Sequence, residues 1–123
     1  MSEVKVKEGE ELNGLGVVLQ QTIDKNLQDP KKQKGIVKLK GTIVVKESDA
    51  DTAVTIDFRH GDIQIQNGAI DKPAAYLEST FLNLASINSG QVGPIMALLT
   101  GKIKVRGNLL KLLQMSSAII TKE

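Results

Sequence analysis

The stretch Gly101-Lys-Ile-Lys-Val-Arg-Gly107-Asn108, which runs directly into Leu109-Leu-Lys-Leu-Leu-Gln-Met115, decides the fold. Its apolar and basic residues alternate with a period of two, which is typical of a strand with one apolar face. Gly107 can adopt a positive φ and Asn108 is a favoured N-cap, so a turn and a helix are expected to follow. This helix, to about Ile120, is apolar around most of its circumference. It therefore needs apolar surroundings on more than one side, and these are either protein core or a bound ligand.

The N-terminal part of the chain predicts one helix between two irregular segments. Apolar residues recur at intervals of three and four from Glu10 to about Gln28, which indicates an amphipathic helix. The helix is expected to end at Asp29-Pro30, because the residue before a proline avoids helical dihedral angles. Residues 1–8 are interpreted as a polar arm and residues 31–34 as a linker.

The middle of the chain predicts strands joined by short turns. Alternating patterns cover residues 36–46, 53–59 and 63–66, and a fourth strand is expected at 75–79. Short turns between successive strands favour antiparallel pairing. With the strand of the opening stretch, the prediction is a five-stranded, mostly antiparallel sheet.

Two further helices are expected between the fourth and fifth strands. Thr80 is a suitable N-cap for a helix that Gly90 ends, and Pro94 suits the first turn of a short helix that Gly101 ends. The predicted class is α+β, with the helices gathered on one face of the sheet. The other face, rich in lysine, glutamine and aspartate, is expected to remain solvated.

Bulk properties describe a single domain that spans residues 1–123. The chain has no cysteine, so it contains neither a disulfide nor a reactive thiol. Residues 1–8 lack the apolar core of a signal peptide, and the longest uninterrupted apolar run, residues 95–99, is far too short to span a bilayer. We expect a soluble, cytoplasmic protein.

Charge is distributed unevenly although the net charge is only +2. Residues 31–46 contain six lysines and no acid, while residues 47–71 contain six acids and Arg59. A solvated strand edge, where lysines discourage pairing with another chain, explains most of this pattern. The alternative is a basic face that makes transient contact with an anionic membrane surface. Nucleic-acid binding is not expected, because three aromatic residues are too few for a base-stacking platform.

Residue patterns for catalysis, metal binding and cofactor binding are absent from the sequence. His60 is the only histidine and lies in an expected hairpin turn, near Asp57 and Asp62, which are more simply explained as strand and turn residues. The acids at positions 47–51 lack the rest of an EF-hand loop. We therefore expect a protein that is not an enzyme and that needs neither metal nor cofactor, with a small lipid or thioester enzyme using Asp57 and His60 as the least favoured alternative.

The run Leu98-Leu-Thr-Gly101-Lys-Ile-Lys-Val-Arg-Gly107-Asn108 resembles the Gly-Lys-apolar-Lys-apolar-basic-Gly-Asp/Asn signature of the sterol carrier protein-2 (SCP2) domain family. Ser89-Gly90 and Pro94-Ile-Met-Ala97 match the small-residue break and short helix that precede it, and the likeness covers roughly residues 8–120. The resemblance implies a lipid-binding α+β domain with an apolar tunnel between sheet and helices. A compact, free-standing chain with few aromatic residues suggests a prokaryotic type of this family. The terminal Thr121-Lys-Glu123 does not match a Ser-Lys-Leu-type peroxisomal signal, so peroxisomal targeting is not expected.

The hypothesis that follows is a lipid-binding and transfer protein whose cavity lies between the sheet and the C-terminal helices. The hydrophobic ligand would be a fatty acid, an acyl-CoA, or a sterol-like or isoprenoid-like molecule, with sterol less favoured. The expected lining residues are Phe58, Tyr76, Phe81, Leu84, Ile87, Ile95, Met96, Leu99, Leu112 and Met115. The last helix, attached through Gly107, is the expected door. The alternative is a non-catalytic module that uses the same apolar surface to form a homodimer or to dock on a partner.

Overall fold

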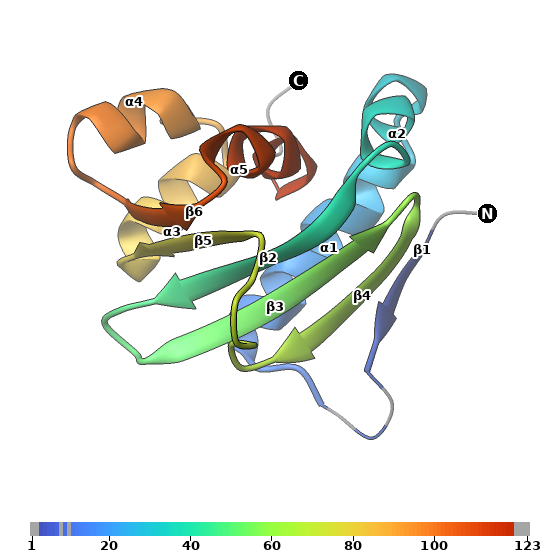
Figure 1. Ribbon diagram of the computed structural model, residues 1–123, viewed down its shortest axis with the longest axis horizontal. Coiled ribbons are helices and arrows are strands. Elements are labelled where there is room, and N and C mark those ends of the chain that lie inside the picture. The colour runs from blue at the N-terminus through green and yellow to red at the C-terminus, as the bar shows by residue number, and fades with distance from the viewer. Residues whose placement is uncertain (1–2, 8, 10, 120–123) are drawn as a thin grey trace.

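In the computed structural model, which describes residues 3–7, 9 and 11–119, a six-stranded sheet packs its helices on one face (Figure 1). The strands are β1 (Glu3–Val6), β2 (Lys40–Glu47), β3 (Thr52–Arg59), β4 (Asp62–Asn67), β5 (Ala75–Ser79) and β6 (Lys104–Gly107). The helices are α1 (Gly14–Leu27), α2 (Pro30–Ile36), α3 (Phe81–Asn88), α4 (Pro94–Leu99) and α5 (Leu109–Ser116), followed by the 3₁₀ turn η1 (Ser117–Ile119). The predicted α+β class is therefore confirmed. No helix in this described part of the chain is long and apolar enough to cross a membrane.

The sheet has the strand order β1-β4-β3-β2-β5-β6 and is mostly antiparallel. The pairs β2–β3, β3–β4 and β5–β6 are antiparallel, and the pairs β1–β4 and β2–β5 are parallel. The hairpin expected around His60 forms, with φ of 53° at His60 and 94° at Gly61, as a two-residue turn between right-twisted strands requires.

The expectation of five strands with a polar arm at residues 1–8 is wrong in one respect. Glu3–Val6 forms β1, which lies parallel to β4 and adds a sixth strand at the edge of the sheet. Val4 and Val6 are partly buried against the core, and they alternate with charged residues in the period of a strand. Four residues are too few to predict a strand locally, so the neighbouring β4 decides the structure of this segment.

The boundaries of the first helices also differ from the expected ones. α1 begins at Gly14 because Asn13 caps it, its side chain accepting a hydrogen bond from the Gly16 amide; Glu10 lies outside the described residues. The expected linker at residues 31–34 is part of α2, which Asp29 caps and in which Pro30 occupies the first turn. As a result β2 begins at Lys40, four residues later than the expected start of that strand.

The connection between β4 and β5 crosses the face of the sheet that carries no helix (Figure 1). The crossover is needed because β5 pairs with β2 and not with β4. The hydroxyl of Thr55 donates to the Gly68 carbonyl and accepts from the Ile70 amide, and the Thr42 hydroxyl accepts from the Ala74 amide. Val44, which lies on this face, is fully buried. The expectation of a wholly solvated outer face is therefore wrong at its centre.

The opening stretch of the sequence forms the expected strand, turn and helix. Gly107 has a φ of 84°, and the Asn108 side chain caps α5 by accepting a hydrogen bond from the Lys111 amide at 3.1 Å. α5 ends at Ser116 and passes into η1, so the helix is shorter than expected; Ile120 lies outside the described residues. The buried sides of all five helices join the apolar face of the sheet in one core.

Candidate functional site

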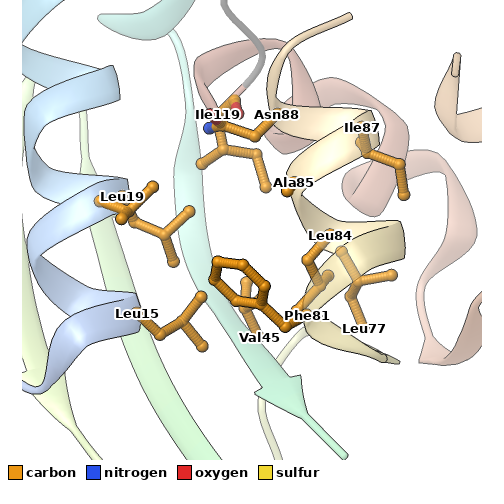
Figure 2. Close-up of a pocket in the computed structure, with 11 residues that line it drawn as sticks. Leu15, Leu19, Val45, Leu77, Phe81, Leu84, Ala85, Ile87, Asn88 and Ile119 are labelled. Atoms are coloured by element: carbon orange, nitrogen blue, oxygen red, sulfur yellow. Dashed lines mark hydrogen bonds between the residues drawn. The ribbon is translucent and has the colours of Figure 1, made fainter. Parts of the chain in front are cut away.

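An apolar cavity lies between α1, α3, the sheet and η1. Figure 2 shows side chains from these elements converging on it, with the Phe81 ring pointing from α3 toward α1. None of the described side chains that line it is charged, and Asn88 is the single polar one among them. The lining residues are Leu15, Val18, Leu19, Val45, Leu77, Phe81, Leu84, Ala85, Ile87, Asn88 and Ile119.

The outer wall of this cavity is α3, and its N-terminal end is held by polar contacts with other segments. Thr80 caps the helix, and the Phe81 amide donates to Oδ1 of Asp49 in the β2–β3 turn at 3.1 Å. The Asn83 side chain donates to the carbonyl of Lys102 at 3.2 Å. Phe81 nevertheless remains 52% exposed, so its ring covers the cavity mouth without closing it.

The C-terminal end of α3 is held by Asn88. Its Nδ2 atom donates to Oγ1 of Thr22 on α1 at 3.0 Å and to the carbonyl of Ile119 in η1 at 2.8 Å. One amide group therefore joins three of the elements that enclose the cavity. Between the two ends, only Leu84 and Ile87 of the eight residues in α3 are buried.

Of the ten residues expected to line a tunnel, the structure brings three together in this cavity, namely Phe81, Leu84 and Ile87. Phe58, Leu112 and Met115 are instead buried in the protein core, each at most 3% exposed. Ile95, Met96 and Leu99 project from α4 into solvent, with 58%, 56% and 74% of their surface exposed.

Tyr76 lies on the opposite face of the sheet from the cavity. Strand alternation buries its neighbours Ala75 and Leu77 and turns Tyr76 outward, where the Arg106 guanidinium stacks on its ring at 4.2 Å. Its hydroxyl donates to Glu78 at 2.6 Å. Burial, together with this hydrogen bond, raises the pKa of Tyr76, and the same hydrogen bond lowers the pKa of Glu78.

The contribution of α1 to the cavity was not expected from the sequence. Leu15, Val18 and Leu19 belong to the amphipathic pattern that predicted the helix, but that pattern does not distinguish a core position from a cavity wall. Val45 and Leu77 could have been found from strand alternation, since both occupy positions on the apolar face. Asn88 carried no sequence signal, because its role depends on segments far apart in the chain.

The C-terminal segment is attached at more points than Gly107, contrary to the expectation of a door with a single tether. The Lys111 ammonium group donates to the Lys40 carbonyl at 2.6 Å, and the Asn26 side chain donates to the Ala118 carbonyl at 2.8 Å. Met115 is 1% exposed. These contacts fix α5 and η1 against α1 and the sheet.

Among the described residues that line the cavity there is no acid, base or nucleophile. His60 is exposed at the hairpin turn, and Asp57 forms an ion pair with Arg59 at 2.7 Å. Within the described residues, no cluster of histidine and acidic side chains could hold a metal ion. The described residues of the cavity therefore form an uncharged, apolar enclosure with one polar side chain, Asn88.

Fold and cavity together define a small α+β domain that encloses an apolar site between its sheet and its helices. The family model of the SCP-2 sterol transfer family matches residues 19–119, so the chain belongs to that family, as its signature indicated. Membership supports lipid binding or transfer as a general role. No curated protein matches the chain at the level of sequence.

Solved structures share this fold at low sequence identity. The apo form of sterol carrier protein 2 from Yarrowia lipolytica is 20% identical with a TM-score of 0.65, the match covering 89% of this chain and 95% of that one. The ubiquinone synthesis protein UbiJ-SCP2 is 12% identical with a TM-score of 0.67, covering 86% and 90%. The sec-alkylsulfatase Pisa1 from Pseudomonas sp. is 18% identical with a TM-score of 0.64; the match covers 73% of this chain but only 14% of the alkylsulfatase.

Proposed function

We propose that this chain carries a hydrophobic molecule whose aliphatic part lies between α1, α3 and the sheet. The observation that supports this most directly is the uncharged lining of the cavity beneath the exposed ring of Phe81. Burial of apolar ligand surface contributes roughly 25 cal/mol per Å², so a fatty acid, acyl-CoA or isoprenoid-like chain can bind there without a charged contact. The sterol named in the family description is a further candidate, and the proposed role includes no catalytic step.

The cavity has to widen to accept such a molecule. Its volume is about 70 Å³, whereas pockets that enclose small molecules span roughly 300–1,000 Å³. α3 is the wall best placed to move, because it buries only two side chains and ends near Gly90, which has a φ of 81°. The proposed door is therefore α3, which is held by hydrogen bonds at its ends but by only two buried side chains, and not the C-terminal segment, which buries five residues of α5 and η1.

Substitution at the rim of the cavity tests the proposal. Ala85 is exposed yet lines the cavity, so Ala85→Trp would place a large ring across the entrance without disturbing the core. Leu82→Trp on the same helix is the matched control, because Leu82 is 73% exposed and is not a lining residue. Both variants introduce the same side chain into a protein that has no tryptophan.

Native mass spectrometry after incubation with a long-chain fatty acid, followed by lipid extraction, measures occupancy. We expect a stoichiometric adduct in the unmodified protein and in Leu82→Trp, and at least a tenfold weaker affinity in Ala85→Trp. The absence of an adduct from the unmodified protein, with fatty acid, acyl-CoA, isoprenoid and sterol alike, would refute the carrier function. Equal binding by the two tryptophan variants would place the ligand elsewhere.

A docking or dimerisation module is the second candidate function. The exposed apolar side chains of α4 favour a surface that contacts another structure, independently of the cavity. An anionic membrane is one of the structures that such a surface would contact.

A further inference from the structure

A hollow opens on the face of the sheet that carries no helix, where the β4–β5 connection, which crosses that face in Figure 1, meets β5 and β6. Its volume is about 320 Å³, within the range of roughly 300–1,000 Å³ typical of small-molecule pockets, whereas the apolar cavity on the other face measures about 70 Å³. Residues 70–73 of the connection, Tyr76 of β5, and Arg106 and Gly107 of β6 line it. The hollow is therefore large enough for a small organic molecule, and its lining, unlike that of the cavity, is charged.

Arg106 is a lining residue whose position is fixed by Tyr76. The two residues lie opposite each other in the β5–β6 pair, and the guanidinium carbon is 4.2 Å from the centre of the tyrosine ring. The ring is fixed in turn, because its hydroxyl donates to Glu78 at 2.6 Å. Stacking occupies one face of the guanidinium group and leaves its charge in place, while the N–H groups lie in the guanidinium plane, where they can bind a carboxylate or a phosphate. A stacked arginine therefore loses less conformational freedom on binding such a group than a mobile arginine does.

Lys72 is the second cation that lines the hollow, and its backbone conformation is unusual. Its φ is 53°, in the left-handed region, and the next residue is Pro73, before which extended conformations are preferred. A residue in such a conformation has to be held there by its surroundings, and strained residues of this kind are concentrated at functional sites. The connection thus places a lysine at the hollow where the backbone by itself favours glycine.

Neither Arg106 nor Lys72 forms an ion pair within the described part of the chain. A second hollow also borders Tyr76, but there the ammonium group of Lys46 lies 3.2 Å from a carboxylate oxygen of Asp51. The two hollows therefore differ in charge. Only the hollow beside Arg106 combines small-molecule size with two cations that have no carboxylate partner among the described residues.

The remaining lining residues narrow the class of ligand. Asp71 contributes a carboxylate, which can accept a hydrogen bond from a hydroxyl group of the ligand. Ile70 and Pro73 contribute apolar surface. Two cations and one carboxylate suit a molecule with an anionic group at one end and hydroxyl groups elsewhere. A bare anion, by contrast, would be repelled by Asp71 without gaining such a hydrogen bond.

We propose that the hollow binds a small hydroxylated organic anion, whose carboxylate or phosphate group contacts Arg106 and Lys72 and whose hydroxyl groups donate to Asp71. This site is separate from the proposed carrier function. Strand alternation places Tyr76 on one face of the sheet and Leu77, which lines the apolar cavity, on the other. The protein then binds a polar molecule and a hydrophobic one on opposite faces of the same sheet.

Isothermal titration calorimetry with four probes tests the ligand class. Glucose 6-phosphate and gluconate carry an anionic group together with hydroxyl groups, whereas inorganic phosphate and acetate carry the anionic group alone. We expect saturable binding of glucose 6-phosphate or of gluconate, and at least tenfold weaker binding of the corresponding bare anion. The protein has one tyrosine and no tryptophan, so a change in the fluorescence of Tyr76 reports that the ligand occupies the hollow.

Two matched pairs of variants test the residues of the site. Arg106→Gln removes the guanidinium charge, and Lys104→Gln, two residues earlier on the same strand and face, removes a charge that lies opposite Glu78 and outside the hollow. Lys72→Gly removes the ammonium group and suits the left-handed backbone, so this variant is expected to fold. His60→Gly is its control, because His60 has the same φ of 53° and does not line the hollow.

Arg106→Gln and Lys72→Gly should each weaken the affinity at least tenfold, and Lys104→Gln and His60→Gly less than twofold. Equal losses in test and control variants would show a nonspecific attraction of anions and overturn the proposal. It would also be overturned if neither glucose 6-phosphate nor gluconate bound the unmodified protein, or if the bare anions bound as tightly. Fatty-acid binding should remain unchanged in all four variants, because none of the substituted residues lines the cavity.

Discussion

Replacement of Gly107 by alanine probes the junction between β6 and α5. A Cβ atom at this position would lie 2.6 Å from the carbonyl oxygen of Ala74, well inside van der Waals contact. That oxygen is not free to move, because it accepts a hydrogen bond from the Asn108 amide at 2.8 Å. Gly101 is a matched control, since its φ is 73° against 84° at Gly107, yet a Cβ there would meet nothing within 4 Å.

The two substitutions separate backbone conformation from crowding. A non-glycine residue in the left-handed region costs about 1–3 kcal/mol, and this term applies to both variants. Displacement of backbone to relieve crowding adds about 1–3 kcal/mol, and this term applies to Gly107→Ala alone. We therefore expect a loss of unfolding free energy of about 2–6 kcal/mol for Gly107→Ala and about 1–3 kcal/mol for Gly101→Ala.

Urea denaturation followed by far-ultraviolet circular dichroism measures both values. The unfolding free energy should fall with urea concentration at the same slope in both variants. A shift in the urea concentration at the unfolding midpoint then reports a change in stability alone. Equal losses for Gly101→Ala and Gly107→Ala would refute the argument that the Ala74 carbonyl restricts position 107. In that case the left-handed backbone conformation, which positions 101 and 107 share, would account for the whole loss of unfolding free energy.

Because Tyr76 is the only tyrosine, its ionisation can be followed by tyrosinate absorbance. Burial and the hydrogen bond to Glu78 raise the pKa of Tyr76, so this absorbance should develop above the usual tyrosine pKa near 10. Glu78→Gln should lower the midpoint of this titration. Because the pKa of Tyr76 is higher in the folded than in the unfolded protein, the neutral side chain contributes fully to the unfolding free energy below about pH 10. This contribution is lost as the pH rises through the folded pKa. An unchanged titration midpoint in Glu78→Gln would contradict the reasoning. Asn88→Ala removes the donor to the Ile119 carbonyl and should lower the unfolding free energy by about 1–3 kcal/mol. Thermal unfolding measures this loss, and a change within error would show that the amide does not hold α3.

Local sequence patterns determined the elements whose signals are self-contained. Alternation and turn residues placed β3 and β4, and the caps Thr80 and Asn108 placed the starts of α3 and α5, because each signal depends on residues only a few positions apart. The glycine-rich signature before α5 was specific enough to indicate the family. In contrast, β1 depends on its pairing with β4. The start of α2 did carry a local signal, but Asp29-Pro30 both ends α1 and begins α2, and only the end of α1 was predicted from the sequence.

The sequence by itself therefore determined the α+β class, the family and the apolar character of the site. Only the tertiary structure decided which apolar side chains enclose the cavity and which fill the core or face solvent. Periodicity assigns Leu15 on α1 and Met115 on α5 to buried faces alike, yet only Leu15 lines the cavity. The difference arises from how closely neighbouring elements approach, and that distance depends on contacts such as the Asn88 hydrogen bonds, which join residues 31 and 66 positions apart.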